Sequence, residues 1–336
     1  MKYKLVIMTM LFAANTTAQT AIDVHSHIIT PEYVEVLREN HAELEEGFPV
    51  PQWSAESHLQ FMDAAGIKCS VLTLSAPQPF FGNAGESSHC IRQVNEASAR
   101  LKAAHPDRFK FCAALPLPDV AAAVREVVYA LDTLHADGIK LATNSRGQYL
   151  GDEALDTLMK VLDERHAVVI VHPHRPTPYE TKLMQNTPLA MSEYPAETTR
   201  AVLNMISRNV LARYPNVKVV VPHCGSYLPL AVPRMKAVYP AVHAKGLVQT
   251  IDWEANLSRL YYDLAGGASP EIIKIMLSIT TPDHILYGSD YPYISADVLT
   301  KNKQRLTDAL SHDPQLAPYA EMFLHENAER LFGGGK

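Results

Sequence analysis

The sequence has few cysteines and no pattern that would pair them. Its four cysteines are widely spaced and form no Cys-x-x-Cys motif, which argues against a zinc knuckle and against a disulfide framework. The chain also lacks internal repeats, low-complexity segments and a basic stripe with interleaved aromatic residues. Because its formal net charge is −6, it does not have the features of a general nucleic-acid-binding protein.

Long apolar runs are also missing, apart from a short one near the N-terminus. Lys2 and Lys4 form a basic start, residues 5–14 are largely apolar, and a small, polar tail ends near Ala18. The apolar run is too short to span a membrane, and the three-part pattern predicts a signal peptide over residues 1–19. We therefore expect cleavage near residue 18 or 19 and an exported, periplasmic mature protein; a buried first strand or a simple N-terminal arm is the alternative.

Apolar, β-branched segments alternate with amphipathic segments along the rest of the chain. The predicted strands are residues 21–27, 69–76, 109–115, 138–143, 167–173, 217–223, 260–264 and 285–290. The predicted helices are residues 56–65, 87–104, 119–134, 152–165, 195–213, 226–239, 270–280 and 296–310, with a last helix near 317–332. Eight such pairs without a break in composition predict a single (β/α)8 TIM barrel over residues 20–336. A doubly wound sheet shows the same alternation. Two proline-containing segments, 31–55 and 174–195, are expected to be long loops at the pocket.

Histidine or aspartate stands at the predicted carboxyl end of four strands. His25 and His27 share one face of the first strand because side chains two residues apart point the same way. His172, His223 and Asp290 end strands five, six and eight, and the active site of a barrel lies at these ends. Imidazoles and a carboxylate together can bind a divalent metal, and a further histidine can move a proton. Each residue also has an ordinary alternative as a polar strand-end, turn or helix-capping residue.

Several motifs give the chain a resemblance to the amidohydrolase superfamily. Within that superfamily it is most similar to the branch of aminocarboxymuconate semialdehyde, γ-resorcylate and 6-methylsalicylate decarboxylases. The motifs are the His-x-His strand, Met62-Asp63-Ala64-Ala65-Gly66-Ile67, Val71-Leu72-Thr73-Leu74-Ser75-Ala76-Pro77, Pro106-Asp107-Arg108-Phe109, Gly138-Ile139-Lys140-Leu141, Val171-His172-Pro173, His223-Cys224-Gly225 with Pro233-Arg234, and Gly288-Ser289-Asp290-Tyr291-Pro292.

The resemblance implies a set of roles for these residues. His25, His27, His172 and Asp290 would bind one divalent metal, Zn²⁺ as the first choice and Mn²⁺ as the alternative. His223 would be the acid/base group, with Asp290 as its catalytic partner. The resemblance also implies a homodimer acting on a small-molecule substrate.

The substrate-binding residues are less defined by the pattern. The muconate enzyme has arginines after its first strand, whereas this chain has Trp53 and its neighbours there, which favours a less charged, aromatic substrate. Arg146, Tyr149 and Arg175 lie on predicted loops and can hold a carboxylate. Arg234 resembles an arginine that contacts substrate or supports structure in relatives. The alternatives are a core position for Trp53, solvated loop arginines, and an ion pair for Arg234.

These residues support two kinds of reaction. The first is non-oxidative decarboxylation of a small aromatic or unsaturated carboxylic acid, in which His223 protonates the carbon that bears the carboxylate. The second is hydrolysis of a lactone, ester or amide, with Asp290 as the proton acceptor. Lys140 could be carboxylated and bridge a second metal, or be an ammonium buried against a carboxylate. A metal-bearing binding protein without catalysis is a third possibility.

Overall fold

Eight parallel strands form the centre of the molecule. The computed structural model describes residues 21–179 and 187–333, so the predicted signal peptide lies outside the described residues. The strands follow the order β1-β2-β3-β4-β7-β8-β9-β10, and each neighbouring pair is parallel. Their bounds are β1 Ala21–Ile28, β2 Ile67–Leu74, β3 Phe109–Ala113, β4 Gly138–Ala142, β7 Val168–His172, β8 Lys218–Val221, β9 Leu260–Asp263 and β10 Ile285–Leu286.

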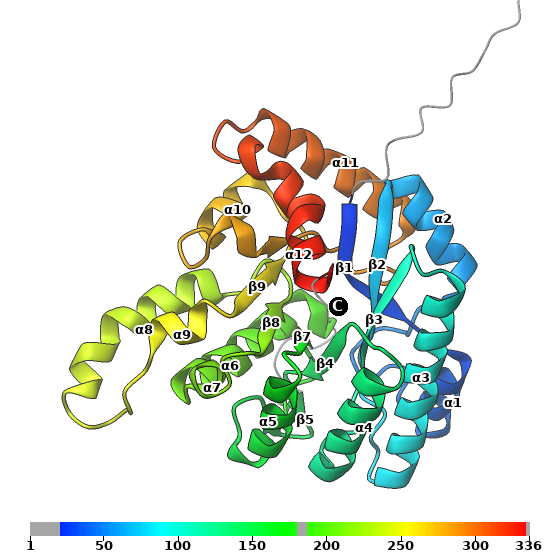
Figure 1. Ribbon diagram of the computed structural model, residues 1–336, viewed down its shortest axis with the longest axis horizontal. Helices are drawn as coiled ribbons and strands as arrows, with labels where there is room; N and C mark the ends of the chain where they lie inside the picture. The colour runs from blue at the N-terminus through cyan, green and yellow to red at the C-terminus, as the bar shows by residue number, and fades with distance from the viewer. Residues whose placement is uncertain (1–20, 180–186, 334–336) are drawn as a thin grey trace, which may run out of the picture.

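The first and last strands meet and complete a barrel. The backbone N–H of Val24 donates to the carbonyl of Tyr287 at 3.0 Å, and that of His27 donates to Tyr291 at 2.8 Å. These bonds bring the chain after β10 alongside β1, with the helices arranged around the strands (Figure 1). The predicted (β/α)8 TIM barrel is therefore confirmed, with all eight strands at their expected places in the sequence.

Helices follow the strands and cover the outside of the barrel. Their bounds are α1 Pro31–Glu39, α2 Ala55–Ala65, α3 Ala84–Ala104, α4 Val120–Asp132, α5 Asp156–Glu164, α6 Glu193–Ser207, α7 Val210–Arg213, α8 Leu228–His243, α9 Trp253–Leu257, α10 Pro270–Met276, α11 Ala296–His312 and α12 Asn327–Gly333. A two-stranded hairpin, β5 Asn144–Ser145 with β6 Gln148–Tyr149, follows β4. The described helices include none with the length and apolar character needed to cross a membrane.

The local structure differs from the sequence-based expectation at several places: the β5–β6 hairpin and helix α9 were not expected, and two further differences have a clear local cause. Helix α1 lies inside the segment 31–55 that was expected to be a loop; Thr30 caps it, Pro31 begins it, and Tyr33 and Leu37 bury one face. The helix expected over 195–213 is divided into α6 and α7 because Asn209 adopts a positive φ of 53°. Asparagine tolerates this left-handed conformation better than most residues, so the chain can turn there.

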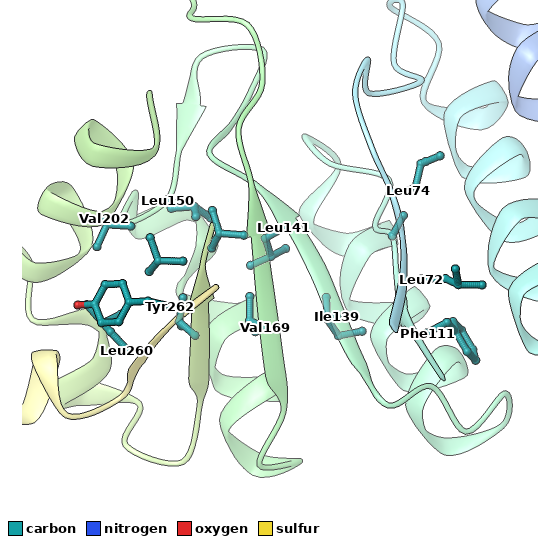
Figure 2. Close-up of a cluster of buried hydrophobic side chains, with 14 of the residues drawn as sticks. Leu72, Leu74, Phe111, Ile139, Leu141, Leu150, Val169, Val202, Leu260 and Tyr262 are labelled. Carbon is teal, nitrogen blue, oxygen red and sulfur yellow. The ribbon is translucent and has the colours of Figure 1, made fainter. Parts of the chain in front are cut away.

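Two apolar layers hold the barrel together. The larger layer lies between the strands and the helices and includes Leu72, Ile139 and Val169, which point outward from their strands (Figure 2). The smaller layer fills the barrel and contains Ile22, Val24, Cys69, Val71, Cys112, Val168, Ile170, Val220 and Leu286. Ala328, Leu331 and Phe332 of α12 pack against this interior layer, so the last helix closes the end of the barrel opposite the strand carboxyl ends. The four cysteines are buried and unpaired.

Candidate active site

A β-bulge in β1 sets the direction of its two histidines. Between Asp23 and Ser26 the pairing with β2 advances by three residues on β1 and by two on β2. The extra residue reverses the alternation of side chains. Val24 and His25 are the two residues inside the bulge. Ile22 and Val24 face the barrel interior, and His25 and His27 also point inward, at the mouth of the barrel.

Four side chains from three strand ends meet at the mouth of the barrel. They are His25, His27, His172 at the end of β7 and Asp290 after β10, and one nitrogen or oxygen from each lies within 4.8 Å of the others. The three imidazoles are buried, and Asp290 is partly buried. Its Oδ1 lies 3.1 Å from Nε2 of His27 and 3.5 Å from Nε2 of His25. Three imidazoles and one carboxylate at these distances form a site for one divalent metal.

Each histidine is held through its Nδ1 atom. His25 Nδ1 lies 2.8 Å from Oδ2 of Asp263, at the end of β9, and His27 Nδ1 lies 2.9 Å from Thr73 Oγ1. His172 Nδ1 contacts the carbonyl of Pro173 at 2.9 Å. These contacts direct the Nε2 atoms toward the common centre, as is usual for metal-binding histidines. His25 Nε2 is buried and has no hydrogen-bond partner in the described structure, which fits a metal ligand.

The electrostatics of three of the four residues favour the protonation state that metal binding requires. Burial lowers the pKa of His27 to about 4 and lowers the pKa of His172 well below its ordinary value. Burial opposes ionisation of Asp290, but its contacts with His223, His25 and His27 hold its pKa well below the ordinary value. The carboxylate is therefore ionised and these two imidazoles are neutral near pH 7. His25 differs: burial lowers its pKa, but Asp263 and Asp290 together outweigh that effect and raise the pKa above its ordinary value.

Asp263 also fixes the strand end that carries His223. Its Oδ1 accepts hydrogen bonds from the backbone N–H groups of His223 and Ala265, both at 3.0 Å. His223 has a φ of +57°, and Asp290 one of +69°, so both adopt a conformation that costs non-glycine residues energy. His223 Nε2 lies 3.8 Å from Asp290 Oδ2. The geometry thus places an additional imidazole beside the carboxylate of the metal site.

Close packing explains a glycine in the last motif. A Cβ atom on Gly288 would lie 2.8 Å from Cβ of His25 and 3.3 Å from Cβ of Asp263. Any side chain at this position would therefore displace His25 or its partner. The Gly288-Ser289-Asp290 sequence lets the chain after β10 approach β1 closely enough for Asp290 to reach the histidines.

A cavity of about 600 Å³ opens in front of these residues. His172, His223 and Asp290 lie in its wall together with four aromatic residues from separate segments. These aromatic residues are Phe48, Tyr194, Tyr227 and Tyr293. The Tyr293 ring lies 5.5 Å from the ring of His27 and 5.4 Å from that of Phe48, edge to face. Most of the remaining wall is aliphatic, so the cavity suits a flat, largely apolar molecule with one anionic end.

The two loop arginines predicted to hold substrate lie outside this cavity. Arg146 donates to Glu45 Oε1 at 2.5 Å and to the carbonyl of Phe80, and Arg175 lies 4.0 Å from the same Glu45 oxygen. Both line smaller pockets beside the main cavity. Their charges are thus partly neutralised by Glu45.

The other three predicted substrate-binding residues are also absent from the described wall of the main cavity. Tyr149 lies on β6, and its hydroxyl accepts from Arg200 at 3.4 Å. Trp53 donates from Nε1 to His58 Nδ1 at 3.1 Å and packs on the core. Arg234 is exposed on α8.

Lys140 is buried close to the metal site. Its Nζ lies 2.8 Å from Nε2 of His174 and 3.4 Å from the carbonyl of Ser75. Burial lowers the pKa of Lys140 to about 7. The structure therefore gives Lys140 polar partners other than the four metal-site residues. Its predicted alternative role as a bridge to a second metal stays a prediction.

The comparison with known families matches this architecture. The model of the family described as amidohydrolase matches residues 22–334, nearly the whole described chain. The chain belongs to the amidohydrolase family. Two curated proteins illustrate the similarity in sequence. A protein named decarboxylase yanB, from Aspergillus niger, is 35% identical over 296 residues, which cover 84% of this chain and 79% of that protein. The 6-methylsalicylic acid decarboxylase of Penicillium expansum is 30% identical over 285 residues, covering 83% and 87% of the two chains.

Solved structures of other proteins have the same fold. One described as amidohydrolase II has a TM-score of 0.85 and 31% identity, covering 93% of this chain and 99% of that chain. A 5-carboxyvanillate decarboxylase from Novosphingobium aromaticivorans, solved with bound manganese, has a TM-score of 0.82 and 22% identity. It covers 95% of this chain and 98% of that chain, and at this identity the likeness shows the fold alone.

Several residues of the amidohydrolase site were not identified from the sequence. Asp263 follows two tyrosines at the end of a predicted strand, a position at which aspartate could have been noticed. Thr73 lies in a motif assigned only to the resemblance. Glu46, Tyr194 and Tyr293 lie outside the predicted strands and helices, and only the folded chain brings them to one cavity.

Proposed function

We propose that this protein is a metal-dependent, non-oxidative decarboxylase of a small aromatic carboxylic acid. One observation carries the proposal. The four residues of the metal site lie beside a cavity with aromatic residues in its wall, and His223, which is not one of the four, also lines that cavity. Curated relatives that are 30% and 35% identical are named as decarboxylases, and one of them is named for 6-methylsalicylic acid. This agreement favours decarboxylation over hydrolysis of a lactone, ester or amide.

The metal site would hold the acidic end of the substrate. His25, His27, His172 and Asp290 would bind the ion, which when bound supplies positive charge that stabilises anionic oxygens. Phe48, Tyr194 and Tyr293 surround the space in front of it and exclude water from the ring. A low-dielectric wall of this kind strengthens the electrostatic interactions at the acidic end.

His223 and Asp290 are placed to supply the proton. The two side chains lie 3.8 Å apart and both face the cavity. A proton from this pair adds to the ring carbon that bears the carboxylate. The bond between that carbon and the carboxylate then breaks, its electron pair returns to the ring, and carbon dioxide leaves. The backbone of His223 is fixed by Asp263, which keeps the imidazole at the cavity.

We assign the metal as zinc, with manganese as the alternative. Three imidazole ligands suit zinc, whereas the carboxylate of Asp290 is also compatible with manganese. The manganese found in the 5-carboxyvanillate decarboxylase supports the alternative. Elemental analysis of protein purified without chelator separates them. We expect one equivalent of a single metal per chain and its loss in His25→Ala.

The reaction is tested by product analysis on two classes of substrate. Metal-loaded protein is given 6-methylsalicylate in one assay and an aromatic lactone in another, with carbon dioxide and acid release measured in each. We expect carbon dioxide from the first and no acid from the second. Acid release from the lactone without decarboxylation would instead support a hydrolase. His223→Ala is expected to retain the metal and lose the activity.

We also propose that the protein is exported and forms a homodimer. The N-terminal sequence supports export, and N-terminal sequencing of the native protein tests it by showing a start near residue 19 or at Met1. Exposed apolar residues at the cavity rim support a dimer: Met191 and Leu230 are each 72% exposed. Sedimentation analysis of the wild type and Leu230→Glu tests this, since a monomeric wild type contradicts it.

A further inference from the structure

Glu46 is a buried carboxyl group in the wall of the main cavity. It lies in the segment after α1, its side chain is 5% exposed, and it borders both the main cavity and a smaller polar pocket. Apart from Asp290, it is the one acidic residue among the described residues that line the main cavity. A carboxyl group in this position is costly unless it has partners.

Tyr194 links Glu46 to the metal site. Its hydroxyl donates to Glu46 Oε2 at 2.9 Å, and its ring lies 6.0 Å from the ring of His172. Among the described residues, Tyr194 is the one hydrogen-bond donor to the Glu46 carboxyl group. The other oxygen, Oε1, can therefore accept a hydrogen bond from a ligand. Glu46 is therefore held across one aromatic ring from a metal ligand.

The cations near Glu46 lie outside the main cavity and not in its wall. The described residues of the main cavity wall include no lysine or arginine. Lys140 and Arg175 act on Glu46 from outside this wall and favour its ionised form, whereas Glu45 opposes it. Burial is the largest effect and raises the pKa of Glu46 to about 7. At pH 8 the cavity therefore presents a carboxylate as acceptor, without a cation to bind a second acidic group.

We propose that Glu46 determines specificity by accepting a hydrogen bond from a ring hydroxyl remote from the metal and by excluding a second carboxylate from that position. The inference rests on the proposed function for its substrate class, but it concerns binding at the ring edge and not the proton transfer. The preferred substrate is then a monocarboxylic aromatic acid with a hydroxyl on the edge that faces Glu46.

A pair of phenols tests this without turnover. The two ligands, 3-methylphenol and 5-methylbenzene-1,3-diol, differ by one hydroxyl. Their dissociation constants are measured at pH 8 by calorimetry on zinc-loaded wild type, Glu46→Gln and Glu45→Gln. Glu45 is the matched control because it is the neighbouring glutamate and does not line the described main cavity. Metal content and melting temperature are measured for each protein.

We expect the wild type to bind the diol about 10-fold more tightly than the monophenol, because the extra hydroxyl bonds to a charged acceptor. In Glu46→Gln the single side-chain oxygen is taken by Tyr194 and the amide NH₂ faces the ligand, so the ratio should fall to about 3 or less. Glu45→Gln should keep the wild-type ratio. A wild-type ratio near 1, or the same ratio in Glu46→Gln, would overturn the proposal.

Rates of decarboxylation provide a second test of the role of Glu46. Wild type should decarboxylate 2,4-dihydroxy-6-methylbenzoate with a higher kcat/KM than 6-methylsalicylate, and should reject 5-carboxyvanillate. Glu46→Gln should reduce the preference for 2,4-dihydroxy-6-methylbenzoate over 6-methylsalicylate. It should also increase binding of the dicarboxylate 5-carboxyvanillate, since it removes a negative charge from the cavity. If no acid is decarboxylated but the phenol ratios behave as expected, the proposed function fails and the role of Glu46 stands. If decarboxylation occurs with unchanged phenol ratios, the reverse holds.

Discussion

Replacing Asp263 with asparagine should weaken metal binding although Asp263 is not itself a ligand. Its Oδ2 accepts from Nδ1 of His25 at 2.8 Å, which leaves the lone pair of His25 on Nε2, the atom that faces the metal position. In Asp263→Asn the Oδ1 atom can still accept from His223 and Ala265. The amide NH₂ would then face Nδ1 and favour the tautomer with the proton on Nε2.

The size of the effect follows from this change of tautomer. Loss of an outer partner of a metal-binding histidine typically reduces metal affinity by about 10- to 100-fold. This corresponds to about 1.4–2.8 kcal/mol of binding free energy. The cost falls on the ion more than on the fold, since two of the three hydrogen bonds of Asp263 are retained in the variant.

A competition titration measures the predicted loss. Zinc affinity is determined against a chromophoric chelator for the wild type, Asp263→Asn and a control variant, Asp137→Asn. Asp137 is a partly buried carboxylate that pairs with Lys102 and Lys110 and contacts none of the four metal-site residues. We expect a 10- to 100-fold weaker zinc affinity in Asp263→Asn and wild-type affinity in the control. An affinity within 2-fold of the wild type in Asp263→Asn would refute the tautomer argument.

Three further predictions concern stability. Burial lowers the pKa of His58 to about 3 in the folded protein. As the pH falls below 6.5, the unfolded state therefore binds a proton at His58 before the folded state does. The contribution of His58 to the free energy of unfolding is complete above pH 6.5 and is lost as the pH falls. His58→Gln should therefore reduce the pH slope of the unfolding free energy between pH 6 and 4 by about 1.4 kcal/mol per pH unit; an unchanged slope contradicts the assignment. Asp119→Ala removes the cap that accepts from the N–H of Ala122 and should cost about 1 kcal/mol in denaturant unfolding, with no loss if the cap is unimportant. Leu72→Ala should cost about 2–5 kcal/mol while one metal equivalent is retained; a cost under about 1 kcal/mol would contradict its place in the core.

The barrel and the metal ligands could be predicted because both depend on local patterns. Strand-length apolar segments alternate with amphipathic helices, and in a barrel the carboxyl ends of the strands meet. His172 and Asp290 therefore came together with the His-x-His pair. The prediction that His25 and His27 face the barrel interior did not take account of a bulge in β1. Strict alternation would put His25 on the face opposite Val24, and the β-bulge that brings both inward has no sequence signal that we used.

The substrate cavity could not be predicted in the same way because its residues meet only through tertiary contacts. Arg146 was a reasonable carboxylate ligand on a loop, but its guanidinium pairs with Glu45, which lies 101 residues away in the chain. Glu46 and Tyr194 meet across 148 residues. Helix α1 did have a local signal, the Thr30-Pro31 start, which the glutamate- and proline-rich composition of the segment obscured.

The central claim is that the metal site and its neighbouring histidine remove a carboxylate from an aromatic ring and replace it with a proton. Incubation of metal-loaded protein with 6-methylsalicylate in D₂O, followed by NMR of the products, tests it most directly. The account predicts 3-methylphenol with one deuterium at the carbon that carried the carboxylate, and none of this product from His25→Ala. Unchanged acid in a fully metal-loaded, folded sample, across 6-methylsalicylate and its hydroxylated analogues, would contradict the account.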